Sequence, residues 1–169
     1  MKPEGQQYRA GILTLSDKGS RGEREDTSGQ HLRKMLVEAG YTVERYLILP
    51  DQQALIEETL VEWADAPDLD LIITTGGTGV APSDRTPEAT RQVIDMEVPG
   101  LAEAMRGESL KKTVQAVWSR GVAGIRAGTL IINLPGSKKA AAENLAAVLP
   151  ALRHGLYKLQ GGAADCGSA

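Results

Sequence analysis

The stretch LDLIITTGGTG, residues 69–79, decides the fold of this chain. Its first seven residues are mostly apolar and dense in Ile and Leu, as in a parallel strand that is buried on both faces of a sheet. The chain then enters Gly-Gly-Thr-Gly at once, and glycines directly after a strand allow a tight turn or a close approach of the backbone to a ligand. We predict further strands at three other short apolar runs, which are residues 10–15 (AGILTL), 43–49 (VERYLIL) and 129–133 (TLIIN).

Helical patterns separate these predicted strands. Asp51 opens one helix, and Thr86 and Pro87 open another, with Thr as the cap and Pro at the first helical position. Pro150 should kink the last helix. The polar stretch 16–27 is expected to be a mobile loop. From the spacing of apolar residues, we predict helices over residues 28–39, 51–66, 86–96, 101–107 and 140–159.

Strands that alternate with helices over short connections favour a sheet of parallel strands covered by helices on both faces. We therefore expect a single α/β domain over residues 1–160, with three layers (α/β/α) and a mostly parallel central sheet. The run 122–125 either forms a hairpin with 129–133 or leaves that strand to stand alone as a parallel strand. Because the chain contains no phenylalanine, the core must be aliphatic. Residues 161–169 are small and polar and are expected to be disordered.

Composition narrows the functional classes. A chain of 169 residues can bury one core, and a hydrophobic content of 41% excludes general disorder. A net charge of −3 argues against a nucleic-acid partner, which would need a basic face. The single cysteine, Cys166, excludes a disulfide framework and a cysteine-built zinc site. The polar residues 1–8, and the lack of an apolar run of about 20 residues, predict a cytoplasmic protein with no membrane partner.

Unusual residues follow each predicted strand. Asp17 comes after the first strand, Asp51 after the second, the glycine turn 76–79 after the third, and the segment 133–137 (NLPGS) after the last. Parallel strands place their carboxyl ends along one edge of the sheet, where ligands of such folds bind. We therefore expect these residues to converge on one site.

The glycine turn offers backbone N–H groups and the Thr78 hydroxyl, which suit a phosphate or another anion. The turn alone is weak evidence, because glycines after a strand are often only a tight turn. The phosphate-loop signature with Gly-Lys-Ser/Thr is absent from the sequence, and so is the G-x-G-x-x-G fingerprint. A standard nucleotide triphosphatase or dehydrogenase is therefore disfavoured.

Asp51 and Asp84 are the candidate metal ligands. Local sequence explains Asp51 equally well as a helix N-cap, and it explains Asp84 as a turn residue before the next helix. If both carboxylates project into one cleft, their hard oxygens suit Mg²⁺, which takes one or two protein carboxylates together with substrate phosphates. The two kinds of role are compatible, since a helix start at a strand end faces the cleft.

The segment 133–137 is typical of a second backbone cradle, and Lys138 and Lys139 follow it. A lysine pair is usually a solvated surface feature, but at a helix start it opposes the helix dipole, and a phosphate ligand would explain it. The hydroxyls of Ser109 and Ser119 are candidate ligand contacts, although the sequence pattern alone does not distinguish either from a serine with no function.

Nucleophilic or acid–base catalysis by side chains has little support. No Ser-His-Asp triad and no metal-binding histidine pair can be assembled from His31, His154 and Cys166. Positioning of substrates with metal electrostatics is favoured instead, and phosphoryl-type transfer needs little more.

Three segments are informative together, namely residues 74–79 (TTGGTG), 83–90 (SDRTPEAT) and 133–137 (NLPGS). In combination they resemble the MogA/MoaB family of molybdenum-cofactor biosynthesis, which includes molybdopterin adenylyltransferases and the G domain of gephyrin. The resemblance extends over about residues 9–159, with PGL at 99–101, ESL at 108–110 and SR at 119–120 at compatible spacings. It implies the α/β fold of a molybdopterin-binding domain.

The resemblance also implies an activity. Such enzymes bind molybdopterin, a pterin with a dithiolene and a terminal phosphate, and transfer AMP from Mg-ATP to that phosphate with release of pyrophosphate. A nucleotidyltransferase with ATP and molybdopterin as substrates and Mg²⁺ as cofactor is therefore implied. So are a homotrimer and contacts with other enzymes of molybdenum-cofactor biosynthesis.

Site residues are carried over by position. The essential aspartates of the family match Asp51 and Asp84, which the resemblance makes both catalytic residues and Mg²⁺ ligands. The resemblance also assigns substrate binding to the glycine loop, the pterin-side serines, the Asn-x-Pro-Gly turn and the lysine after it. These residues are Thr75, Gly76, Gly77, Thr78, Gly79, Ser109, Ser119, Asn133, Pro135, Gly136, Ser137 and Lys139.

The chain departs from the family pattern in two places. Lys138 stands where many members have Pro, and Ser83 precedes Asp84 where many members have a basic residue, with Arg85 following instead. Neither departure removes a metal ligand. The alternatives to an enzyme are a non-catalytic molybdopterin- or nucleotide-binding paralogue, a scaffold protein and an unrelated nucleotide-binding α/β protein. The intact aspartate pair favours the enzyme.

Overall fold

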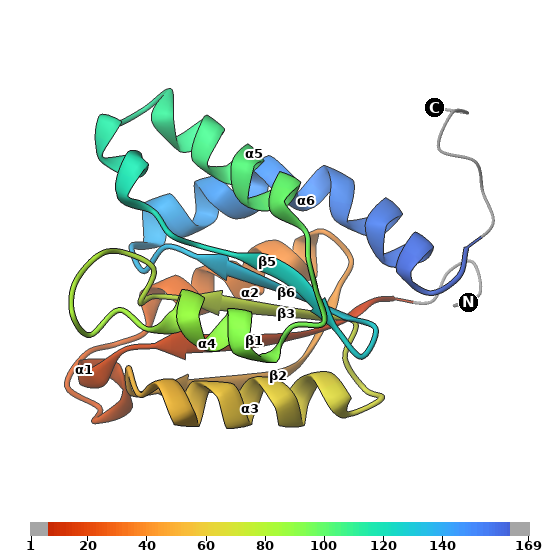
Figure 1. Cartoon of the computed structure of the whole chain (residues 1–169), viewed down its shortest axis with the longest axis horizontal. Helices are drawn as coiled ribbons and strands as arrows, with labels where there is room; N and C mark the ends of the chain where they lie inside the picture. Colours follow the sequence, from red (N-terminus) through yellow and green to blue (C-terminus); the bar gives the residue numbers. More distant parts are fainter. Residues whose placement is uncertain (1–6, 163–169) are drawn as a thin grey trace.

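The computed structural model describes residues 7–162. Its strands are β1 (Arg9–Leu15), β2 (Thr42–Leu49), β3 (Leu71–Thr75), β4 (Met96–Glu97), β5 (Ala123–Arg126) and β6 (Thr129–Leu134). They form one six-stranded sheet in the order β2-β1-β3-β6-β5-β4 (Figure 1). Strands β2, β1, β3 and β6 pair in parallel, whereas β5 is antiparallel to both β6 and β4.

The helices are α1 (Asp17–Ser20), α2 (Thr27–Glu38), α3 (Gln53–Asp65), α4 (Thr86–Val93), α5 (Pro99–Leu110), the 3₁₀ helix η1 (Val114–Trp118) and α6 (Lys138–Leu159). Helices α2, α5 and α6 pack on one face of the sheet, and α3 and α4 pack on the other. This arrangement confirms the predicted three-layer α/β/α fold with a mostly parallel sheet.

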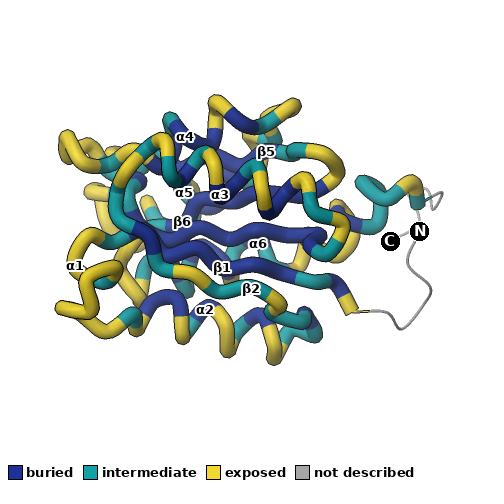
Figure 2. The backbone as a smooth tube through the Cα atoms, turned by 90° about the horizontal axis from the view of Figure 1, so that it is seen from below, coloured by how far each residue is buried: buried dark blue, intermediate teal, exposed yellow. Residues whose placement is uncertain are grey.

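The central strands separate two mainly aliphatic cores, one of which also contains Tyr8 and Tyr41 and the other Trp63. In β3, Leu71 and Ile73 face the core formed with α2, α5 and α6, whereas Ile72 faces the core formed with α3 and α4. Figure 2 shows these strands as a buried band between more exposed helices. The largest fully buried side chains are all Ile and Leu, which confirms the prediction of an aliphatic core.

The antiparallel edge of the sheet differs from the prediction. The helix expected to continue through Met96 ends at Val93, and β4 follows it. The Asp95 N–H donates to the Ile125 carbonyl at 2.7 Å, so pairing with β5 replaces the next helical turn. Residues 122–134 follow the first of the two predicted alternatives, because β5 and β6 form a hairpin. Strand β6 does not stand alone, and it also pairs in parallel with β3 on its other side.

Two predicted helix starts are wrong. Gln52, not Asp51, is the N-cap of α3, and it makes no side-chain cap bond. Arg85 is the N-cap of α4, so Thr86 is the first helical residue and not the cap. Asp51 and Thr86 are therefore free of capping roles, and both instead make contacts at the strand ends.

The stretch predicted to be a mobile loop is a hydrogen-bonded connection. Ser16 caps α1 by accepting from the Gly19 N–H at 3.0 Å, and the Glu23 N–H then donates to the Lys18 carbonyl at 2.9 Å. Asp26 caps α2 by accepting from the Gly29 N–H at 2.8 Å. The backbone between α1 and α2 is thus held at both ends.

The C-terminal part of the chain is a single long helix. Pro150 lies inside α6, which continues to Leu159. Of the tail that was expected to be disordered, residues 163–169 lie outside the described part of the chain. Within residues 7–162, no helix has both the length and the apolar character that crossing a membrane requires.

Candidate functional site

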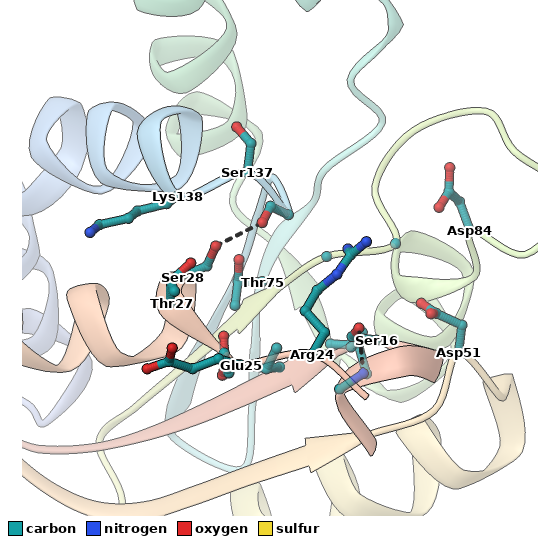
Figure 3. Close-up of a pocket in the computed structure, with 17 residues that line it drawn as sticks. Ser16, Arg24, Glu25, Thr27, Ser28, Asp51, Thr75, Asp84, Ser137 and Lys138 are labelled. Atoms are coloured by element: carbon teal, nitrogen blue, oxygen red, sulfur yellow. Dashed lines mark hydrogen bonds between the residues drawn. The ribbon is translucent and has the colours of Figure 1, made fainter. Parts of the chain in front are cut away.

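The larger of two neighbouring cavities opens at the carboxyl ends of β1, β3 and β6, as predicted, and has a volume of about 520 Å³. We call it the first cavity. Figure 3 shows that its side chains come from the strand ends, from the α1–α2 connection and from the start of α6. Of the residues predicted to form the site, it contains Asp51, Thr75, Gly76, Gly77, Asp84, Gly136 and Ser137.

The turn after β3 requires glycine at its first two positions. Gly76 and Gly77 have positive φ values of 106° and 64°. A Cβ on Gly76 would collide with the Leu15 carbonyl oxygen, and one on Gly77 would lie 3.0 Å from Asp51 Oδ1. The hydroxyl of Thr86 donates to the Gly76 carbonyl at 2.9 Å and holds the turn to the start of α4. The missing side chains thus bring the backbone directly against a carboxylate.

Asp51 is positioned by Asp17, which the sequence analysis placed at the same edge without a role. The Asp51 N–H donates to Asp17 Oδ1 at 3.0 Å, and the Asp17 N–H donates to Asp51 Oδ2 at 3.3 Å. Burial raises the pKa of the Asp51 carboxyl, and the charges of Asp17 and Asp84 raise it further. A bound cation would offset this accumulation of negative charge.

Asp84 is held in a turn on the other side of the glycines. Its Oδ2 accepts from the Ala81 N–H at 2.8 Å, and the Asp84 N–H donates to the Ala81 carbonyl at 2.9 Å. A Cβ on Gly79 would lie 2.9 Å from the same Oδ2. Asp84 is therefore the turn residue that local sequence predicted, and its carboxylate also faces the cavity.

Arg120, which was quoted from the sequence only as part of the motif SR at 119–120, is a positioning residue. Its guanidinium donates to the carbonyls of Gly79, at 2.6 Å, and of Asp84, at 3.0 Å, and it pairs with Glu88 on α4. Its backbone N–H donates to the Thr78 carbonyl at 2.9 Å. One side chain thus holds both ends of the segment that carries Asp84.

The donor set fits a hard divalent cation. No group of three or more His, Cys, Asp or Glu side chains suited to a metal occurs in the described chain. Asp51 and Asp84 both line the first cavity beside the glycine turn and would supply the protein ligands, with phosphates and water completing the coordination. This two-carboxylate arrangement is the usual one for Mg²⁺ bound together with a phosphate substrate.

The turn after β6 packs against the glycine turn. Thr75 donates from its hydroxyl to the Pro135 carbonyl at 2.7 Å, and Ser28 donates to the Gly136 carbonyl at 2.9 Å. A Cβ on Gly136 would lie 3.3 Å from the Gly76 Cα. The two predicted backbone cradles are therefore one continuous surface.

The remaining predicted residues lie mainly in a second, smaller cavity of about 280 Å³. We call it the second cavity. Its lining is more apolar, with Trp118 from η1, and Asn144 donates to the Ser109 hydroxyl at 2.7 Å. The predicted residues that line it are Thr78, Gly79, Ser109, Ser119 and Pro135. The two cavities adjoin at the two turns, since each turn contributes residues to both.

Two predicted residues line neither of these cavities. Lys138, not Lys139, lines the first cavity. Asn133 is only 1% exposed, and its amide donates to the hydroxyls of Thr74, at 3.0 Å, and Thr90, at 2.9 Å. Its Oδ1 accepts from the Val122 N–H at 3.2 Å, so the side chain links β3, α4 and β6 internally.

We expect Asn133→Ala to act on stability. The substitution leaves buried polar groups without partners and opens a small void, which together should cost about 3 kcal/mol. Urea unfolding should show a lower midpoint with an unchanged slope. A normal unfolding free energy with a raised KM for either substrate would contradict this structural role.

Several lining residues were missed because they lie on an irregular connection or directly after it. Arg24 lines the first cavity from the segment between α1 and α2, and Thr27 and Ser28 line it from the first turn of α2. The signal available was Asp26, whose Oδ2 accepts from the Tyr46 hydroxyl and from Thr14 Oγ1. This network fixes the start of α2 against β1 and β2.

Comparison with protein families agrees with this geometry. A model described as "probable molybdopterin binding domain" matches residues 11–154. A molybdopterin adenylyltransferase of Helicobacter pylori strain J99 is 45% identical over 146 residues, which covers 84% of this chain and 82% of the relative. The molybdenum cofactor synthesis protein cinnamon of Drosophila melanogaster is 43% identical over 148 residues. That match covers 87% of this chain, but the chain spans only 25% of the relative.

A solved structure shares the fold. The molybdopterin biosynthesis enzyme MoaB of Thermus thermophilus is 55% identical, with a TM-score of 0.86 over 92% of this chain and 98% of that chain. These matches confirm the resemblance that the three sequence segments indicated. The chain therefore belongs to the family of probable molybdopterin binding domains.

Proposed function

We propose that this protein is a molybdopterin adenylyltransferase, which transfers AMP from Mg-ATP to the terminal phosphate of molybdopterin and releases pyrophosphate. One observation carries the proposal: Asp51 and Asp84 lie against the same glycine turn, at the point where two adjoining cavities meet. The activity named for the Helicobacter pylori relative, which the chain matches over most of its length, supports it.

The two cavities differ in the way that the two substrates differ. The first is polar, with the carboxylates and the glycine N–H groups, and we assign the nucleotide to it. The second has an apolar wall with a few hydrogen-bonding side chains, which suits a flat heterocycle, and we assign the pterin to it. The phosphates of both substrates then meet at the turn 76–79.

The reaction needs positioning more than acid–base chemistry. A terminal phosphate oxygen of molybdopterin attacks the α-phosphorus of ATP, the bond from that phosphorus to the bridging oxygen breaks, and pyrophosphate leaves. Asp51 and Asp84 would hold Mg²⁺, which supplies charge neutralisation to the phosphates when bound. The backbone N–H groups of the turn orient the phosphates and stabilise the developing charge.

We propose a homotrimer as the working form, with other enzymes of molybdenum-cofactor biosynthesis as further partners. The apolar side chains of Val114, Val117 and Trp118 on η1 are each more than half exposed, which favours association with another protein surface.

The proposed activity predicts a product that can be measured directly. Purified protein incubated with molybdopterin and Mg-ATP should form adenylyl-molybdopterin and pyrophosphate in equal amounts, and EDTA should stop the reaction. Binding of molybdopterin without product would instead support the non-catalytic paralogue or scaffold. Failure to bind either substrate would overturn the proposal.

A further inference from the structure

Arg24 extends into the first cavity without an internal partner. It lies on the connection between α1 and α2, and its side chain lines the cavity. In the view of Figure 3, the guanidinium lies between Thr75 and the two aspartates. Within the described chain the structure gives Arg24 no hydrogen bond and no ion pair, and the guanidinium is therefore available to a ligand.

Four other arginines of the chain are paired with carboxylates. Arg21, three residues earlier on the same connection, pairs with Glu23 at 2.8 Å. Arg45, Arg120 and Arg126 are paired with Asp68, Glu88 and Asp65. Arg24 lies in a cavity with four carboxylates, and none of them forms an ion pair with it. The nearby Asp26 is already occupied by Tyr46, Thr14 and the Gly29 N–H.

The backbone that carries Arg24 is held on both sides. The α1 cap and the bond from Glu23 to Lys18 fold the chain before it, and the α2 cap at Asp26 fixes the chain after it. The side chain is exposed, so no packing requirement explains its direction into the cavity.

The charge of the first cavity calls for a cation at this position. Four carboxylates line it, and among residues 7–162 the only lining cations are Arg24 and Lys138. Figure 3 shows the Lys138 side chain extending away from the two aspartates. A polyphosphate chain bound beside Asp51 and Asp84 carries more negative charge than one divalent ion neutralises. A guanidinium can bind two phosphate oxygens at once.

We propose that Arg24 is a substrate-binding residue that contacts the polyphosphate of the nucleotide, opposite the glycine turn. This inference rests on the proposed function, because it takes the first cavity as the nucleotide site. It places at Arg24 a cationic substrate contact, which the family resemblance implies for Lys139.

Arg24→Ala tests the inference, with Arg21→Ala as the matched control from the same connection. Calorimetry in the presence of Mg²⁺ should show an affinity for ATP about tenfold or more below wild type for Arg24→Ala, because a charge-assisted contact is lost. Arg21→Ala should bind ATP like wild type. Arg24→Lys should give an intermediate affinity, since lysine restores the charge but not the two-pronged geometry. Affinity for molybdopterin should change by about twofold or less in all three variants.

The possible outcomes separate the two proposals. If wild-type protein binds no ATP, the proposed function is wrong and this inference falls with it. If wild type binds ATP and Arg24→Ala binds it equally well, only the role of Arg24 is overturned. Equal losses for ATP and molybdopterin would also overturn it, because they would indicate an effect on the whole cavity.

Discussion

Replacement of Asp51 or Asp84 by asparagine should lower kcat/KM for AMP transfer by about a thousandfold or more, with the fold intact. Asparagine keeps the size of the side chain and one oxygen, so the contacts to Asp17 and Ala81 can persist. What is lost is the charge that would hold the cation. Initial rates of pyrophosphate release at ATP concentrations well below KM measure the effect.

In Asp51→Asn, the free energy of unfolding should not fall together with the activity. The raised pKa of Asp51 means that its ionised form is disfavoured in the folded protein. A group with a raised folded-state pKa weakens the fold as pH rises through that pKa, so a neutral asparagine at neutral pH should leave the free energy of unfolding unchanged or higher. Glu58→Gln, an exposed carboxylate change on α3, serves as the control and should alter neither quantity. Activity within tenfold of wild type in both aspartate variants would remove these residues from the reaction.

Gly76→Ala should be the most damaging single methyl that can be added at the site. At a φ of 106° an L-residue is strained, and the new Cβ would meet the Leu15 carbonyl oxygen, which belongs to rigid β1 backbone. We expect a loss of about 3 kcal/mol or more in the free energy of unfolding, since strain and overpacking add. Thermal or urea unfolding gives the value, and ATP binding should fall with it.

Gly107→Ala is the matched control for this glycine change. Gly107 lies inside α5, and a Cβ there has no neighbour within 4 Å. Alanine is the better helix former, so stability should rise by about 0.5–1 kcal/mol. If Gly76→Ala were tolerated as well as Gly107→Ala, the turn after β3 would not depend on glycine.

The parallel part of the fold could be predicted because buried strands require continuous apolar runs. Residues 71–75 show this pattern clearly, and β3 lies at the centre of the sheet. Strand β4 could not be predicted from its own residues, because Met96 and Glu97 are both exposed and show no alternation of buried and exposed side chains. It exists through its pairing with β5, which is a tertiary contact.

The site shows the same division between local pattern and three-dimensional arrangement. Asp51, Asp84 and the glycine turn were found because each directly follows a strand or a turn signal. The separation into two cavities depends on how η1 and α5 fold back, which no local motif encodes. Adjacent residues point in different directions at a helix start, so sequence could not decide between Lys138 and Lys139. Arg24 was missed because an irregular connection has no periodicity.

The Arg120 clamp bears on how such a site can be re-engineered. Ser119, on the wall of the second cavity, directly precedes Arg120, which holds the segment that carries Asp84 into the first cavity. A graft of the proposed pterin wall into another scaffold would therefore remove the anchor of Asp84, the proposed catalytic carboxylate, unless Arg120 and Glu88 were transferred with it. The smallest unit that could be transferred intact is therefore both cavities together, so the proposed pterin wall cannot be exchanged on its own.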